Sequence, residues 1–208
     1  MAENIVHLAV YEGLADWEAA LAVAQIRSGA HQRGPARHDV RTVGLTSEPV
    51  RTMGGLRVVP DLVLDALSPA DSSLLIIPGG GGWEGDGNAA FARAARSFLA
   101  AGVPVAAICA ATAGLAREGL LDDREHTGPA AGFLAATGYA GTALYREAAA
   151  VRDRGLITAG PTAPVDFARE IMAELGVWEP EVLDAWYRLF AHSDAEAYAE
   201  LTALAERR

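Results

Sequence analysis

Short apolar runs alternate with amphipathic segments along most of the chain. Apolar runs rich in Val, Ile, Leu and Ala are typical of strands buried in a parallel sheet, and the segments between them place apolar residues at helical spacing. The pattern predicts strands at 5–10, 39–44, 73–77, 103–108, 147–151 and 156–159, a hairpin at 50–59, and helices at 16–27, 88–101, 111–118, 133–137, 164–175, 180–190 and 194–206.

Interleaved strands and helices of this kind predict an α/β fold. We expect a doubly wound, mostly parallel sheet with helices on both faces and the hairpin as an accessory. No linker or repeat interrupts the pattern, so we expect one domain over residues 1–208, with a C-terminal helical extension at about 178–208. The chain has 208 residues, 51% of them apolar, which is enough for a substantial core.

Charge and composition exclude several function classes. The formal net charge is −10 and no stretch is rich in basic residues, so we expect no nucleic-acid partner. All 17 basic residues are arginine, which excludes a Schiff-base lysine and a phosphate loop that uses lysine. The sequence lacks a secretory signal or membrane-spanning pattern, and a lone cysteine fits a reducing compartment. We therefore expect a cytoplasmic protein without membrane contact.

That lone cysteine, Cys109, lies where an apolar strand leads into a helix. Ligands bind beyond the carboxyl ends of parallel strands, so a side chain at this corner faces a candidate site. The small neighbours Ala107, Ala110 and Ala111 suit a nucleophile elbow, and amide N–H groups with the dipole of the next helix would stabilise a thiolate. Free cysteine is also often a small buried hydrophobic residue, and position alone leaves both interpretations open.

Two acidic residues follow the first predicted strand, at the same rim of the sheet. Glu18 could share or accept the proton of a nearby thiol. Asp16 lies two positions earlier on the predicted helix, so the two side chains face in different directions and only one is expected to point inward. Taken alone, either acid also fits a capping or solvated position at a helix start.

A glycine run, Pro78 to Trp83, follows the third long apolar strand. Glycines there let backbone N–H groups approach a substrate, as an oxyanion hole requires, although a simple tight turn has the same composition. Gly80 to Gly85 also has the spacing G-x-G-x-x-G. We discount a dinucleotide site because the loop does not belong to a first βαβ unit.

Taken together, these segments resemble the ThiJ/PfpI family of the class I glutamine amidotransferase-like superfamily, in particular its bacterial amidotransferase-like branch. The resemblance covers nearly the whole chain and rests on Leu14-Ala15-Asp16-Trp17-Glu18, Thr52-Met53-Gly54-Gly55, Pro78-Gly79-Gly80, Ala107-Ile108-Cys109-Ala110-Ala111-Thr112 and Gly119-Leu120-Leu121-Asp122. It implies a flavodoxin-like fold, a reactive Cys109 hydrogen-bonded by Glu18, and a homodimer.

The chain also departs from members of that family. Protease-like and chaperone-like members carry histidine directly after the cysteine, where this chain has Ala110. His126 is then the best remaining imidazole, as a general base or a group that orients substrate, and an ordinary loop histidine fits equally. Glu18 and Ala110 argue against isonitrile hydration, and His192-Ser193-Asp194 lacks the His-x-Glu of true amidotransferases.

These residues lead to one main hypothesis and two alternatives. We expect a cysteine-dependent hydrolase or lyase for a small carbonyl or amide substrate, with catalytic residues Cys109, Glu18 and His126, and the family resemblance implies activity of the glyoxalase or deglycase type. Oxyanion and substrate contacts are expected from Gly79, Gly80, Ala110, Asp16, Trp17 and Trp83. We expect neither a metal nor a cofactor. The alternatives are a redox sensor or stress-response protein in which Cys109 is oxidised without turnover, and a non-catalytic, chaperone-like dimer.

Overall fold

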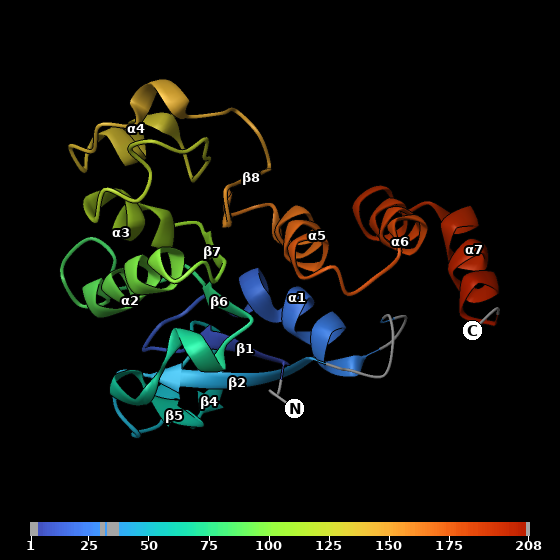
Figure 1. Cartoon of the computed structure of the whole chain (residues 1–208), viewed down its shortest axis with the longest axis horizontal. Helices are drawn as coiled ribbons and strands as arrows, with labels where there is room; N and C mark the ends of the chain where they lie inside the picture. The colour runs from blue at the N-terminus through green and yellow to red at the C-terminus, as the bar shows by residue number, and fades with distance from the viewer. Residues whose placement is uncertain (1–3, 30–31, 33–37, 207–208) are drawn as a thin grey trace.

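A twisted sheet lies at the centre of the molecule (Figure 1). The computed structural model describes residues 4–29, 32 and 38–206, and within them the sheet has seven strands in the order β5-β2-β1-β6-β7-β9-β8. All pairs are parallel except β8 with β9. The strands are β1 (Asn4–Ala9), β2 (His38–Gly44), β5 (Leu62–Val63), β6 (Leu74–Ile77), β7 (Val105–Ile108), β8 (Ala150–Asp153) and β9 (Leu156–Ala159). A separate hairpin pairs β3 (Val50–Arg51) with β4 (Arg57–Val58).

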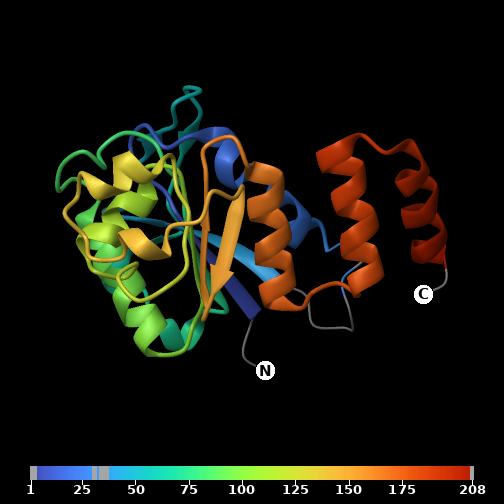
Figure 2. The same ribbon diagram turned by 90° about the horizontal axis from the view of Figure 1, so that it is seen from above.

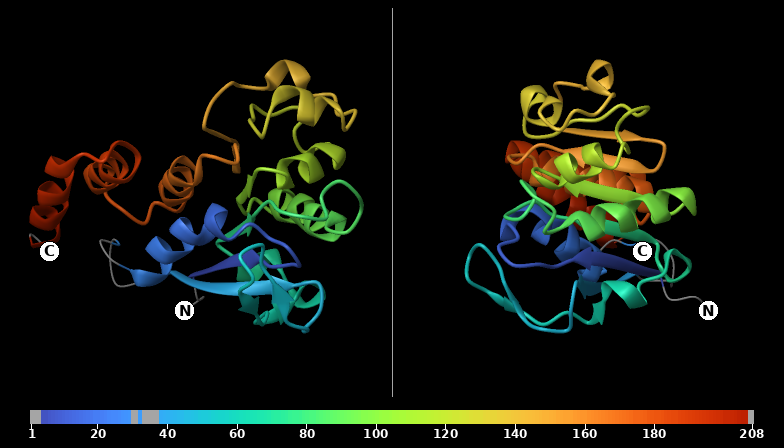
Figure 3. Two further views of the ribbon diagram at one scale, coloured as in Figure 1. Left: turned by 180° about the vertical axis from the view of Figure 1, so that it is seen from behind. Right: turned by 90° about the vertical axis from the view of Figure 1, so that its left-hand side faces the viewer.

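Helices cover both faces of this sheet (Figure 2). One face carries α1 (Asp16–Ser28) and α5 (Pro164–Leu175), with α6 (Pro180–His192) packed on α5; the other carries α2 (Ala89–Ala100) and α3 (Ala111–Arg117), with α4 (Ala131–Ala135) packed on α3. The last helix, α7 (Ala195–Glu206), packs on α6 and lies on the opposite side of the molecule from α4 (Figure 3). Short 3₁₀ turns occur at Leu64–Ala66, Pro69–Asp71 and Thr142–Leu144.

The central strands explain why the core divides into two layers. Every residue of β7 is fully buried, and successive side chains point to opposite faces of a strand. Val105 and Ala107 join the cluster under α2 and α3, whereas Ala106 and Ile108 join the cluster under α1 and α5. Burial on both faces is the reason that these strands are continuous apolar runs, and it fixes their carboxyl ends firmly.

The doubly wound α/β architecture confirms the sequence prediction, and the differences are local. Strand β5 and the 3₁₀ turns at 64–71 were not expected, because segments of two or three residues are too short to show a periodic pattern. Strand β8 begins at Ala150 rather than at residue 147, since the Ala148 N–H turns back to the Arg146 carbonyl. Among the described residues, no helix is long and apolar enough to cross a membrane.

Candidate active site

Cys109 occupies a sharp corner between β7 and α3. Its φ is +58°, a left-handed conformation that is uncommon for a residue with a side chain and costs of the order of 1–3 kcal/mol. Hydrogen bonds on both sides hold this corner: the Cys109 N–H donates to the Ala159 carbonyl at 2.9 Å, and the Thr112 hydroxyl donates to the Cys109 carbonyl at 2.6 Å. The half-buried thiol is thereby turned out of the strand at the carboxyl rim.

Glu18 lies against this thiol although 91 positions separate the two residues in the sequence. Its side chain is 1% exposed, and its carboxyl group is hydrogen-bonded to the Cys109 thiol and accepts the Gly79 N–H at 2.5 Å. Helix α1 begins at Asp16, so its first turn carries Glu18 inward over the ends of β6 and β7. The structure therefore brings together the two residues that the sequence analysis placed at one rim.

The electrostatics of the pair differ from the sequence prediction. Burial, the Glu18 charge and the hydrogen bond to Glu18 raise the pKa of Cys109 to about 12, and the Ala110 N–H only partly opposes them. Burial also raises the pKa of Glu18, against the opposing effect of the Gly79 N–H. A thiolate stabilised by the next helix was expected, but a buried carboxyl neighbour outweighs one amide. The pair consequently keeps the thiol proton at neutral pH and needs Glu18 to receive it.

The glycine loop after β6 packs directly on the pair. A Cβ atom at Gly79 would lie 2.7 Å from Cys109 Cβ, 2.8 Å from Glu18 Oε2 and 3.0 Å from the Ala110 nitrogen. Gly79 was expected to hold an oxyanion, but its N–H is already committed to Glu18. Gly80 pairs with Leu14 in an antiparallel bridge whose hydrogen bonds are made by the neighbouring residues, so the Gly80 N–H points away from Leu14. Among the described residues, neither the Gly80 N–H nor the Ala110 N–H donates to a backbone carbonyl.

Trp83 differs from its predicted position at the pocket wall. It is 2% exposed, its ring lies against Gly114 of α3, and its indole N–H donates to the Tyr11 hydroxyl at 2.9 Å. A glycine in α3 leaves room for the ring, which is why the loop turns inward here. Trp83 is thus a core residue behind the glycine loop. Tyr11, which the sequence analysis did not single out, is its partner.

Asp16 and Trp17 lie beside the site without reaching the thiol. The Asp16 carboxylate accepts the Gly54 N–H at 2.6 Å and bonds the Thr52 side chain, and both contacts lower its pKa. Asp16 therefore anchors the β3–β4 hairpin, and its contact with a substrate stays a prediction. Trp17 is 51% exposed and donates its indole N–H to the Pro161 carbonyl at 3.4 Å, so it remains a candidate contact at the rim.

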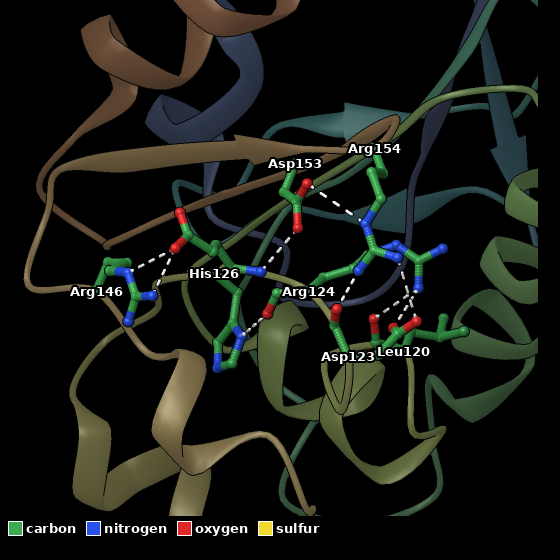
Figure 4. Close-up of polar contacts among 8 residues, drawn as sticks. Leu120, Asp123, Arg124, His126, Arg146, Asp153 and Arg154 are labelled. Carbon is green, nitrogen blue, oxygen red and sulfur yellow. Dashed lines mark hydrogen bonds and ion pairs between the residues drawn. The ribbon is translucent and has the colours of Figure 1, made fainter.

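His126 does not have the catalytic geometry that the sequence suggested. Its Nδ1 lies 2.8 Å from the Arg124 carbonyl (Figure 4), which can only accept, so Nδ1 carries the proton. Nε2 accepts the Tyr139 hydroxyl at 2.8 Å. The ring is fully buried, and burial lowers its pKa. The loop returns to the elbow through Gly128, where a Cβ would meet Thr112 Oγ1 at 2.8 Å. Both imidazole nitrogens are thus committed to structural bonds.

Other features of the described residues do not add to this site. A cavity of about 700 Å³ lies around His7 and Arg41 beneath the 3₁₀ turns, and one of about 260 Å³ lies beside Trp83; neither includes Cys109. No group of three or more His, Cys, Asp or Glu side chains in the described part of the chain could hold a metal ion. Trp178 and Trp186 pack edge to face under the C-terminal helices.

The chain is similar to known proteins over nearly its whole length. The model of the DJ-1/PfpI family matches residues 4–174. The chain is 36% identical over 199 residues to the uncharacterized protease YoaZ of Bacillus subtilis (strain 168), covering 94% of this chain and 95% of that protein. The crystal structure of a ThiJ/PfpI family protein from Bacillus anthracis superposes with a TM-score of 0.89 at 33% identity, covering 98% of this chain and 97% of that one.

A second solved structure, the DJ-1 superfamily protein Atu0886 from Agrobacterium tumefaciens, is 38% identical with a TM-score of 0.82 and covers 91% of this chain and 98% of that one. The matches span nearly the full length, so they include the strand-to-helix corner, the glycine loop and the start of α1. This protein belongs to the DJ-1/PfpI family.

Proposed function

We propose that this protein is a cysteine-dependent hydrolase or lyase that acts on a small carbonyl or amide substrate, with Cys109 as nucleophile and Glu18 as its proton acceptor. One observation carries the proposal: a cysteine held at φ +58° with its thiol hydrogen-bonded to a buried carboxyl group. A strained backbone that presents a nucleophile to its base is typical of catalytic elbows. The protease name of the relative in Bacillus subtilis supports hydrolytic chemistry.

The first step is addition of the Cys109 sulfur to the substrate carbonyl carbon. As the S–C bond forms, the thiol proton passes to Glu18, and the carbonyl electron pair moves to oxygen. The N–H groups of Gly80 and Ala110, neither of which donates to a carbonyl among the described residues, are the candidate donors for that oxyanion. A carboxylate whose pKa is raised by burial is a stronger base than an exposed one, which suits Glu18 to take a proton from a thiol.

The second half of the reaction depends on the substrate. With an amide, collapse of the adduct breaks the C–N bond, Glu18 returns its proton to the leaving amine, and water then hydrolyses the thioester. With an α-oxoaldehyde such as methylglyoxal, Glu18 first returns the thiol proton to the adduct oxygen and then moves the former aldehyde proton to the adjacent carbon, while the adduct hydroxyl proton passes to the oxygen of that carbon; hydrolysis of the resulting thioester releases the 2-hydroxy acid. Both routes consume one water and restore the thiol.

Turnover by the wild type and by Cys109→Ser tests this proposal. We expect the wild type to consume methylglyoxal or glutamine, the two probes, and the serine variant to lose at least a hundredfold in rate. Intact mass spectrometry during turnover should show an adduct on the wild type alone. Equal rates in the two proteins, or no consumption of either probe together with no adduct, would contradict the proposal.

A redox sensor is the second candidate, and the half-buried Cys109 beside Glu18 favours it too. As its proton passes to Glu18, the Cys109 sulfur takes one oxygen from hydrogen peroxide and releases hydroxide, giving the sulfenic acid; a second peroxide gives the sulfinate, water and a proton that neutralises the hydroxide. A protonated Glu18, favoured by its raised pKa, can donate to a sulfinate oxygen. Dose-dependent sulfinate formation at Cys109 without turnover of either probe supports the sensor over the enzyme.

A further inference from the structure

The Tyr11 hydroxyl bonds two successive carbonyls of the glycine loop. It donates to the Pro78 carbonyl and lies 3.0 Å from the Gly79 carbonyl, while the Trp83 indole N–H donates to it at 2.9 Å. Indole nitrogen is only a donor, so the hydroxyl must use a lone pair for Trp83 and direct its own proton at the loop. Tyr11 is 3% exposed, which keeps water from competing for these bonds.

Each of these carbonyls shares a peptide plane with an N–H of the site. In a planar trans peptide the C=O and the following N–H point in opposite directions, and the described peptide bonds are trans. Fixing the Pro78 carbonyl on Tyr11 therefore aims the Gly79 N–H the other way, at Glu18 Oε2, which it meets at 2.5 Å. Fixing the Gly79 carbonyl likewise aims the Gly80 N–H away from Tyr11 and Leu14.

The glycine loop needs a restraint from outside because its own residues restrict the backbone conformation very little. Gly80 has φ +134° and Gly82 has φ +83°, and glycine planes rotate with few steric barriers. The Ala15 N–H also donates to the Gly79 carbonyl at 2.9 Å. Among the described residues, no backbone N–H of a turn or loop donates to the Pro78 carbonyl. Tyr11 is thus its restraint, and Trp83, whose carbonyl accepts Arg117 at 2.5 Å, holds Tyr11 in turn.

We propose that Tyr11, oriented by Trp83, is a positioning residue that sets the two peptide planes of the Pro78–Gly80 turn, and through them the proton affinity of Glu18 and the direction of the Gly80 N–H. The Gly80 part rests on the proposed function, whereas the Glu18 part does not. The Gly79 N–H lowers the pKa of Glu18, so misalignment of this bond raises that pKa.

Tyr11→Phe tests the proposal, because it keeps the ring and its contacts with Trp83 and Phe91 but removes the hydroxyl. The matched control is Tyr187→Phe, which also removes a hydroxyl, here one that donates to Asp166 at 2.6 Å on the α5–α6 interface. The pKa of Glu18 is followed through its carboxylic acid infrared band, which is identified by its loss in Glu18→Gln. Turnover of the probe substrate is measured on the same preparations.

We expect Tyr11→Phe to raise the Glu18 pKa by about one unit, the effect of one charge-assisted hydrogen bond, and Tyr187→Phe to leave it unchanged. Trp83→Phe should shift the pKa in the same direction by less, which keeps the test open if Tyr11→Phe folds poorly. A Glu18 pKa that stays at the wild-type value in folded Tyr11→Phe overturns the proposal.

The turnover readout separates this proposal from the proposed function. If the wild type turns over a probe, Tyr11→Phe should lower kcat/KM roughly ten- to a hundredfold through the Gly80 donor. If the wild type turns over neither probe but Tyr11→Phe still shifts the Glu18 pKa, positioning by Tyr11 stands and the proposed function fails. If Tyr11→Phe shifts the Glu18 pKa but keeps wild-type turnover, the claim that Tyr11 directs the Gly80 N–H fails, and the claim about Glu18 stands.

Discussion

Replacing Gly79 with alanine inserts one methyl group into the centre of the site. That methyl would lie 2.7 Å from Cys109 Cβ, 2.8 Å from Glu18 Oε2 and 3.0 Å from the Ala110 nitrogen, distances too short for unstrained contacts. Two of these neighbours are fixed by backbone, so the loop or the Glu18 carboxyl must move. Overpacking of this kind costs about 1–3 kcal/mol of unfolding free energy, and each kcal/mol lowers Tm by roughly 2–4 °C for a chain of this size.

The functional effect should exceed the loss of stability. A shift of about 1 Å between a nucleophile and its base can cost on the order of a hundredfold in rate. We therefore expect Gly79→Ala to remain folded at 25 °C, to lose turnover by about that factor, and to show a changed pH profile for Cys109 alkylation.

Gly81→Ala, two residues further along the same loop, is the matched control. A Cβ there meets nothing within 4 Å and its φ is not in the left-handed range. Gly81→Ala should therefore keep wild-type turnover, and its free energy of unfolding should change by only about a few tenths of a kcal/mol. Thermal unfolding and turnover are measured on both variants. Equal activity of Gly79→Ala and Gly81→Ala would refute the close packing of this loop on the pair.

Two further predictions concern His126 and Asp16, whose side chains make structural hydrogen bonds beside the site. Burial lowers the pKa of His126 below 6.5, so the unfolded chain binds more protons and the free energy of unfolding falls as pH drops below that value. Replacing His126 with glutamine should flatten the dependence of Tm on pH between 7 and 5, although His7 and His38 contribute in the same direction; an unchanged slope would contradict this reasoning. Asp16→Ala should speed hydrogen exchange at the Gly54 amide while leaving turnover within about threefold, and retained protection at Gly54 would show that the hairpin does not need this carboxylate.

The fold and the Cys109–Glu18 pairing were accessible from sequence for one physical reason. Buried parallel strands produce continuous apolar runs, and parallel strands place whatever follows them at one rim. Cys109, Glu18 and the glycine loop each follow such a run, so their proximity is a consequence of topology. The roles assigned to them remain proposals that the experiments above address.

Other features depend on contacts between distant residues, which no local pattern reveals. His126 is held by Tyr139 and Trp83 by Tyr11, 13 and 72 positions apart, and both rings were expected at the site because their loops lie near it. The thiol pKa depends on the balance between burial, a neighbouring carboxylate and one amide. The sequence indicated the carboxylate and the amide that act on this pKa. It did not reveal the degree of burial, which decides whether the pKa is raised or lowered.

Alkylation and turnover in Glu18→Gln test the central claim most directly. Burial, repulsion by the Glu18 carboxylate and the bond to that carboxylate raise the pKa of Cys109, so removing the charge should lower this pKa by about 1–3 units. The account predicts faster alkylation of Cys109 by iodoacetamide at pH 7, together with a loss of about 10²–10⁴-fold in turnover because the proton acceptor is gone. Slower alkylation, or full turnover without the carboxylate, would contradict the assignment of Glu18 as the base for Cys109.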